Sequence, residues 1–141
     1  MLVTLFLRKS SFHSIENITE SLSKNYTMKN RIHTMSKTSN GILNKIKLML
    51  EAKNNQTRIN HITGDIHFIS FLLKKNRTII TMHDCEVLMN KRFNVIKSYL
   101  YRMFWFTIPS MRVKHIVAIS QETKKQLIKY ANIKENKIKV I

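Results

Sequence analysis

The chain has 141 residues, enough for one domain with a hydrophobic core, and its 43% hydrophobic content excludes an intrinsically disordered protein. It carries 25 Lys and Arg against 8 Asp and Glu, a net charge of +17 that suits nucleic acid, an anionic membrane surface or negatively charged small substrates. Two glycines cannot form a dinucleotide-binding glycine motif or a P-loop, and one cysteine cannot form an internal disulfide, so we expect a reducing, cytoplasmic location.

The amino-terminal part of the chain predicts strands that alternate with helices. Residues 2–7 are apolar but shorter than the ~20 residues of a membrane span, and they lack the basic region and cleavage site of a signal peptide, so they predict a strand. Ser14 is placed to cap a helix with an apolar face. A weaker strand at 26–32, a polar loop at 34–40 and an amphipathic helix at 41–52 follow.

The middle of the chain continues the alternation. Residues 58–63 predict a short strand, which Gly64 terminates, and residues 66–73 predict a short helix. Residues 78–82 form a short β-branched run and give the clearest strand. A long amphipathic helix is predicted over 92–108.

The carboxyl-terminal part begins with Pro109, which we expect just beyond the end of the long helix. Residues 115–119 predict a strand, Ser120 is placed to cap a helix that runs to about residue 131, and residues 137–141 predict a last strand. The chain stops inside that strand, so we expect a truncated piece of a longer protein.

This alternation predicts the fold class α/β, a Rossmann-like, mostly parallel sheet with helices on both faces. No internal repeat or low-complexity linker divides the chain, so residues 1–141 are expected to form a single domain.

Ligands of such sheets bind beyond the carboxyl ends of the strands. Most histidines of this chain are expected there, and only His115 falls at the start of a strand. The titratable and polar residues expected at this edge are His13, Ser14, His33, His61, Asp65, His67, His83, Asp84 and Ser120.

Each of these residues also has a plain structural interpretation. A histidine in a turn is often only a polar loop residue, and Ser120 is more easily a helix cap than a nucleophile. Asp65 could cap the helix that starts at residue 66, and Asp84 could orient His83 or be solvated. We expect Cys85 to be a small buried residue, since nothing marks it as a nucleophile.

Two other site chemistries are weighed and disfavoured. Zinc or manganese ligands could come from His61, Asp65, His67, His83 and Asp84. Their spacing matches no compact ligand motif, so we expect no metal. A Ser-His-Asp hydrolase is disfavoured because the sequence has no G-x-S-x-G elbow.

Four runs of the sequence, in this order and spacing, resemble the amino-terminal domain of family 4 glycosyltransferases. They are residues 60–67 (NHITGDIH), 78–84 (TIITMHD), 116–124 (IVAISQETK) and 137–141 (KIKVI). The opening residues 7–9 and 12–16 look like those of a bacterial subgroup. The resemblance implies one half of a GT-B fold, in which two Rossmann-like domains face each other across a cleft.

In this family the amino-terminal domain binds the acceptor and the carboxyl-terminal domain binds the nucleotide-sugar. His83 matches a histidine that lies near the reacting sugar, so the resemblance implies a catalytic role for it. The residues that match acceptor or substrate contacts are His13, Ser14, His61, Gly64, Asp65, His67, Asp84 and Ser120. Of these, Ser120 begins a recurring serine-and-acid helix start that we interpret as mainly structural.

The resemblance further implies hexosyl transfer, with retention, from a nucleotide-sugar to a glycan or lipid-linked acceptor in cell-envelope polysaccharide synthesis. The nucleotide-sugar is a co-substrate, and no cofactor or metal is expected. Because the donor-binding domain with its paired glutamates lies beyond these residues, we expect the isolated chain to be inactive.

Two non-catalytic alternatives rest on charge. A nucleic-acid-binding domain is disfavoured because no zinc finger, RNP, KH or helix-turn-helix signature is visible. A peripheral attachment to an anionic membrane surface, at the inner face of the membrane, is compatible with the hypothesis of a transferase. Its support is the mixture of basic and aromatic residues in the predicted helix 92–108, namely Lys97, Tyr99, Tyr101, Arg102 and Trp105.

Overall fold

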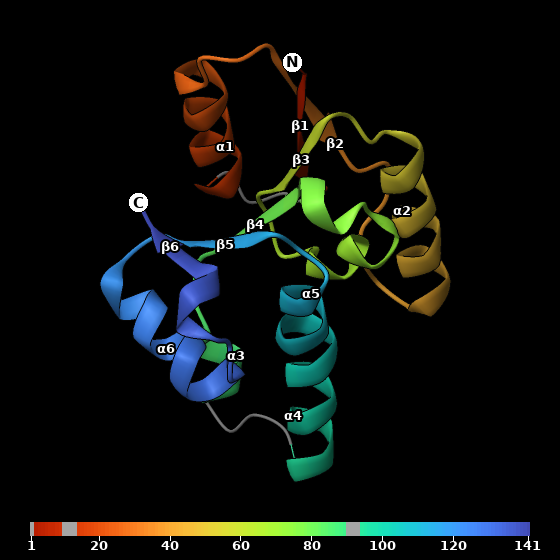
Figure 1. Cartoon of the computed structure of the whole chain (residues 1–141). Helices are drawn as coiled ribbons and strands as arrows, with labels where there is room; N and C mark the ends of the chain where they lie inside the picture. The colour runs from red at the N-terminus through yellow and green to blue at the C-terminus, as the bar shows by residue number, and fades with distance from the viewer. Residues whose placement is uncertain (1, 10–13, 90–93) are drawn as a thin grey trace.

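The computed structural model describes residues 2–9, 14–89 and 94–141. Six strands form one sheet in the order β2-β1-β3-β4-β5-β6, and every pair of neighbours is parallel (Figure 1). The strands are β1 (Val3–Leu7), β2 (Asn30–Thr34), β3 (Ile59–Ile62), β4 (Thr78–Met82), β5 (His115–Ala118) and β6 (Ile138–Val140). The predicted α/β class with a parallel sheet is therefore confirmed.

Helical segments connect the strands. The α-helices are α1 (Ser14–Asn25), α2 (Ile42–Asn54), α3 (Glu86–Met89), α4 (Val95–Arg102), α5 (Ile108–Met111) and α6 (Gln121–Ala131). The other helical turns are η1 (His67–Leu72), η2 (Lys75–Arg77), η3 (Met103–Thr107) and η4 (Glu135–Lys137). Within the described ranges, none of these helices combines the length and apolar character that crossing a membrane requires.

One face of the sheet carries the main hydrophobic core. Strand register aligns a row of buried apolar side chains, Phe6, Ile62, Ile80, Ile116 and Ile138. The same cluster contains Leu48 of α2, Ile69 of η1, Phe106 of η3 and Leu127 of α6. Burying these side chains stabilises the domain and fixes which helices lie on this face.

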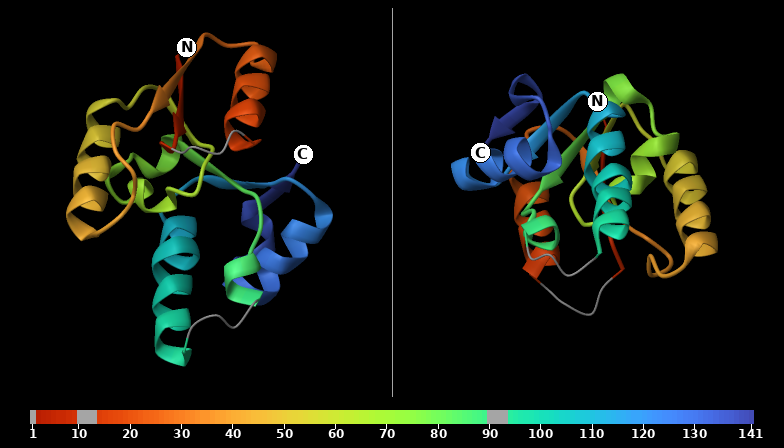
Figure 2. Two further views of the ribbon diagram at one scale, coloured as in Figure 1. Left: turned by 180° about the vertical axis from the view of Figure 1, so that it is seen from behind. Right: turned by 90° about the horizontal axis from the view of Figure 1, so that it is seen from below.

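The opposite face is covered by α1 and is polar where α1 meets it. Thr19 of α1 donates a hydrogen bond to Thr63, with 3.0 Å between the hydroxyl oxygens. Tyr26, just after α1, hydrogen bonds His61 of β3, whose side chain points away from the face that carries Ile62. Helices thus lie on both faces, as predicted, and both views of Figure 2 show α1 apart from α2.

The predicted position of Pro109 is wrong. The long helix begins after its cap Asn94 and runs through α4, the π-helical turn η3 and α5, so that Pro109 lies in the second position of α5 instead of beyond the helix end. The wide turn bonds the Ile108 N–H to the Met103 carbonyl. A π turn resets the hydrogen-bond ladder, which lets the helix tolerate a proline without an N–H.

Smaller elements also differ from the prediction. The short helix predicted over 66–73 is present as the 3-10 helix η1, because the Ile69 and Leu73 N–H groups bond carbonyls three residues back. The second strand begins at Asn30, since the Tyr26 N–H still bonds the Leu22 carbonyl. Helix α3 was not predicted. Gly41 caps α2 with a φ of 78°, a conformation that favours glycine.

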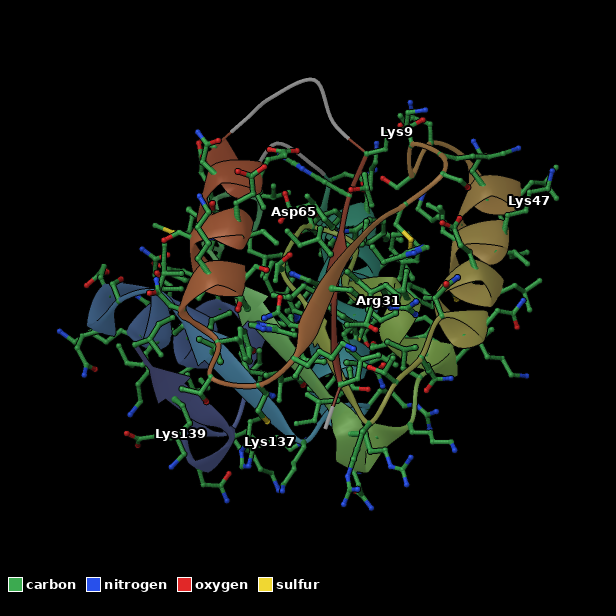
Figure 3. The ribbon with its side chains drawn as sticks, turned by 90° about the horizontal axis from the view of Figure 1, so that it is seen from above. Lys9, Arg31, Lys47, Asp65, Lys137 and Lys139 are labelled. Carbon is green, nitrogen blue, oxygen red and sulfur yellow. The ribbon has the colours of Figure 1, made fainter. Side chains whose placement is uncertain are left out.

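Basic side chains are distributed widely over the molecule. Figure 3 shows Lys47 on the outer side of α2, whereas Lys137 and Lys139 lie near β6 at the opposite end of the view from Asp65. Among the described residues, basic side chains therefore lie on more than one helix and at more than one side of the molecule.

Candidate functional site

The candidate site lies where β1, β3, β4 and β5 end, which we call the carboxyl edge. Arg8 follows β1, Thr63 and Asp65 follow β3, and His83 follows β4. Because the strands are parallel, residues far apart in the sequence reach the same edge. The edge therefore brings together most of the polar residues that the sequence singled out.

His83 is held by one of its two ring nitrogens. Its Nε2 lies 2.9 Å from the carbonyl oxygen of Thr63. A carbonyl oxygen can only accept, so Nε2 carries a proton, and in the neutral ring Nδ1 is left with a lone pair. Within the described residues Nδ1 has no hydrogen-bond partner. The half-buried ring is thus oriented, with one acceptor nitrogen available to a ligand.

The backbone of His83 is fixed by the start of α6. The Thr123 hydroxyl donates to the His83 carbonyl oxygen at 3.1 Å. Ser120 accepts from the Thr123 N–H at 3.0 Å, so it is the N-cap of α6. The predicted capping role of Ser120 is confirmed, and the cap positions the threonine that holds His83.

Thr63 connects three elements beneath the carboxyl edge. Its hydroxyl donates to the Phe6 carbonyl oxygen of β1 at 3.0 Å and accepts from Thr19 of α1 at 3.0 Å. Its own carbonyl accepts from His83. A buried hydroxyl with several partners of this kind makes the local backbone rigid, so Thr63 supports the position of the His83 ring.

His61 differs from His83 because both of its ring nitrogens are occupied. Nδ1 lies 2.8 Å from the Tyr26 hydroxyl and Nε2 lies 2.7 Å from the Thr81 hydroxyl. Burial, with a smaller effect of the nearby His83, lowers the pKa of His61 to about 4. The ring is therefore neutral at pH 7 and ties β3 to β4 and to the segment after α1.

His67, the first residue of η1, is also buried. Its Nδ1 donates to the Trp105 carbonyl oxygen at 2.9 Å, and its Nε2 is buried without a partner among the described residues. Burial lowers the pKa of His67, while Asp65 raises it and His83 lowers it further.

Asp65 forms an ion pair with Arg8, whose Nη1 lies 3.2 Å from Oδ2 of the carboxylate. The interpretation of Asp65 as a helix cap is wrong, because Ile66 occupies the cap position of η1 without a side-chain hydrogen bond. A Cβ added to the buried Gly64 would lie 3.4 Å from the Arg8 backbone nitrogen, so the loop passes close to the end of β1. Asp65 itself remains half exposed at the carboxyl edge (Figure 3).

Asp84 and Cys85 lie between His83 and the start of α3. Oδ1 of the exposed Asp84 accepts from the Glu86 N–H at 3.1 Å. Cys85 is a free, fully buried cysteine, and burial, reinforced by Asp84, raises the pKa of its thiol to about 12. Its sulfur is therefore a thiol and not a nucleophilic thiolate, which confirms the prediction of a small buried residue.

The remaining predicted residues are more peripheral. His13 lies outside the described residues, and Ser14 is the exposed first residue of α1. His33 of β2 pairs with Glu51 of α2, with 2.9 Å between Nε2 and the carboxylate. His115 begins β5, at the opposite end of the strand from the carboxyl edge.

Sequence reasoning missed four residues of the site: Arg8, Glu16, Thr63 and Thr123. Thr63 could have been found, because it is the last residue of a predicted strand and directly precedes Gly64. Both carboxylate oxygens of Glu16, in the first turn of α1, are buried without a partner among the described residues. No sequence signal identified Thr123, whose role depends on a contact forty residues away with His83.

The histidines and carboxylates of the carboxyl edge do not gather as metal ligands. In residues 2–9, 14–89 and 94–141, no three His, Cys, Asp or Glu side chains form a group that could hold a metal ion. Hydrogen bonds make several ring nitrogens unavailable as metal ligands. Of the four ring nitrogens of His61 and His67, two are hydrogen bonded to hydroxyl groups and one to a carbonyl oxygen.

In a comparison with protein-family models, residues 17–141 match Glycosyltransferase Family 4. The chain belongs to this family. The six-stranded parallel sheet with helices on both faces is consistent with a half of the GT-B fold that family 4 enzymes have. Comparisons with curated proteins and with solved structures gave no match.

Proposed function

We propose that this chain is the acceptor-binding part of a family 4 glycosyltransferase, which transfers a hexosyl group from a nucleotide-sugar to a glycan or lipid-linked acceptor. In this proposal a separate domain binds the nucleotide-sugar as a co-substrate, and the chain alone does not turn it over. Family membership supports the class of enzyme. The residues of the carboxyl edge support the proposal that this chain binds the acceptor.

The observation that carries the proposal is the hydrogen bonding of His83. Its Nε2 is committed to Thr63, which leaves the Nδ1 lone pair for a ligand at the edge where parallel sheets bind their substrates. An acceptor sugar offers hydroxyl groups that donate to such a nitrogen. His83 would orient the attacking oxygen and support proton movement away from it, as a positioned base does.

The other edge residues would bind the acceptor around His83. Asp65 and Asp84 are exposed carboxylates that can accept from sugar hydroxyls. The Arg8 guanidinium beside Asp65 and the net charge of +17 would favour an approaching diphosphate. The free, buried Cys85 suits a reducing, cytoplasmic location.

The experiment has a binding arm and a turnover arm on the purified 141-residue chain. Saturation-transfer NMR with methyl glycosides of glucose, galactose, mannose and N-acetylglucosamine measures acceptor binding. Release or transfer of label from radioactive UDP-glucose and GDP-mannose measures turnover. We expect binding of at least one glycoside and no turnover.

Two matched variants locate the binding. His83→Gln keeps an N–H that can donate to the Thr63 carbonyl, but its acceptor is an amide oxygen that does not occupy the position of Nδ1, so it should abolish the glycoside signal. His115→Gln makes the same change at the opposite end of the sheet and should leave the signal unchanged. Turnover by the chain alone, or glycoside binding that survives His83→Gln, would contradict the proposal.

A further inference from the structure

A groove separates α2 from α4 and η3 on the core face of the sheet. Ile42 and Ile46 of α2 form one wall, Leu100 and Phe104 form the other, and Phe68 and Phe71 of η1 form the floor. Helix α2 lies beside η1, and the long helix that ends in η3 and α5 meets η1 from its other side, with α4 extending away from the sheet (Figure 1). The cavity volume of about 520 Å³ lies within the ~300–1,000 Å³ range of small-molecule sites.

The walls of this α2–α4 groove expose large apolar side chains to solvent. Ile42 is 77% exposed, and Ile46, Leu100 and Phe104 are each between 43% and 48% exposed. A contiguous apolar surface of this kind is unfavourable in water and marks a binding site in soluble proteins. The concave shape, with an aromatic floor, fits a flexible hydrocarbon chain.

The charge of the groove indicates which head group the bound hydrocarbon chain would carry. Lys45 of α2 and Lys97 of α4 line it, and none of the described residues that line it is acidic. The Lys45 Nζ lies 2.7 Å from the Ser39 carbonyl oxygen and 5.4 Å from the centre of the Trp105 ring, so the ammonium is held at the groove. Two lysines on opposite walls complement an anionic head group such as a phosphate.

The groove adjoins the carboxyl edge through η3 and the end of α4. The ring of Trp105 lines the groove, while its carbonyl oxygen accepts from His67. Tyr101 also lines the groove, and its pKa is raised to about 12 by burial and by the nearby Asp65 and Asp84. A ligand in the groove would therefore contact Trp105, whose carbonyl oxygen is bonded to His67 near the carboxyl edge.

We propose that the α2–α4 groove binds the hydrocarbon chain of a lipid phosphate, whose anionic head lies against Lys45 and Lys97. This inference rests on the proposed function and deepens it, because it selects a lipid-linked acceptor over a free glycan. The lipid would hold the acceptor sugar next to the carboxyl edge.

The single tryptophan of the chain, Trp105, reports on the groove directly. The probe is a brominated dodecyl phosphate, used below its micelle concentration, because a bromine atom quenches tryptophan fluorescence only at short range. We expect saturable quenching of the 141-residue chain. The same brominated chain that ends in a hydroxyl should bind about tenfold more weakly, since it cannot pair with the lysines.

A matched pair of variants on α2 separates the groove from the rest of the helix. Ile46→Asp puts a carboxylate into the groove wall and should weaken binding of the phosphate probe about tenfold or more. Leu43→Asp makes the same change at a 74% exposed residue that does not line the groove, and it should leave binding unchanged. Lys45→Gln should reduce the preference for phosphate over hydroxyl.

The absence of quenching would overturn the inference, and so would equal affinity for the phosphate and the alcohol. Quenching only by vesicles with brominated phosphatidylglycerol, weakened equally by Ile46→Asp and Leu43→Asp, would overturn it in favour of a bilayer surface. The glycoside test above is independent. Glycoside binding without binding of the phosphate probe would support the acceptor-binding function and contradict the lipid site. Binding of the phosphate probe without glycoside binding would support the lipid-phosphate site and contradict the proposed acceptor-binding function.

Discussion

His61 lies on β3 and His83 directly follows the neighbouring strand β4, yet their surroundings give the two histidines opposite roles. His61 is buried and both of its ring nitrogens have hydroxyl partners, Tyr26 and Thr81. His83 is half buried and only its Nε2 has a partner. An edge histidine is therefore a candidate for ligand binding only when the folded protein leaves one of its ring nitrogens without a partner.

The largest expected effect is the pH dependence of stability that His61 produces. Its pKa falls from 6.5 to about 4 on folding, so the unfolded chain binds more protons between these values. Stability is therefore full above pH 6.5 and decreases as pH falls to about 4, by about 3 kcal/mol from this residue. Urea unfolding at pH 7 and pH 4 measures the loss.

The variant His61→Gln is the control for this effect, because it removes the titrating group. His67, whose pKa is also lowered by burial, should retain a loss of the same sign, as should Glu51, whose pKa is lowered against burial by hydrogen bonds from Ser36 and His33. If the pH 7 to pH 4 difference were the same in His61→Gln as in the wild type, the structural role of His61 would be refuted.

At pH 7, His61→Ala should lower the free energy of unfolding by about 2 kcal/mol, since it leaves a cavity and removes the partner of two hydroxyl groups. Urea denaturation checks this value. His83→Ala is the comparison, and it should cost less because the ring is only half buried. A larger cost for His83 would reverse the assignment of roles.

Ser120→Ala should cost about 1 kcal/mol of stability through the lost cap of α6. It should also weaken glycoside binding, because Thr123 holds the His83 backbone from the first turn of that helix. Ser120→Asp retains a capping oxygen and should restore both quantities. Chemical denaturation and the glycoside NMR assay measure them. If stability fell while glycoside binding stayed unchanged, Ser120 would stabilise α6 without positioning His83.

The smallest expected effect on stability is that of His83→Gln, below about 0.5 kcal/mol, because the glutamine amide can replace the Nε2 donor to Thr63. The same variant should abolish glycoside binding. A thermal or urea unfolding curve distinguishes this specific loss from a general one, and a large destabilisation would mean that His83 is primarily structural.

Local signals predicted most of the fold. The β-branched run Thr78–Met82 has the predicted strand bounds, and Ser120 makes the predicted cap hydrogen bond. Pro109 misled the prediction because a proline normally stops a helix, whereas the π turn at η3 accommodates it. That turn is a feature of packing and not of any local sequence pattern.

The candidate site was predicted less completely, because its selectivity depends on contacts between distant residues. The rule for strand ends placed His61 and His83 together, but it could not show that Tyr26 and Thr81 occupy one ring and leave a nitrogen of the other. The α2–α4 groove likewise forms between helices about fifty residues apart, so neither amphipathic pattern alone could predict it.

The most direct test of the account is a ring-nitrogen NMR spectrum of the chain labelled with nitrogen-15 histidine, recorded during titration with a methyl glycoside that binds. Variants His83→Gln and His61→Gln assign the two rings. The account predicts that His83 carries its proton on Nε2 and that its Nδ1 resonance moves with glycoside, while both nitrogens of His61 stay fixed. A proton on Nδ1 of His83, or a glycoside shift at His61 with none at His83, would contradict it.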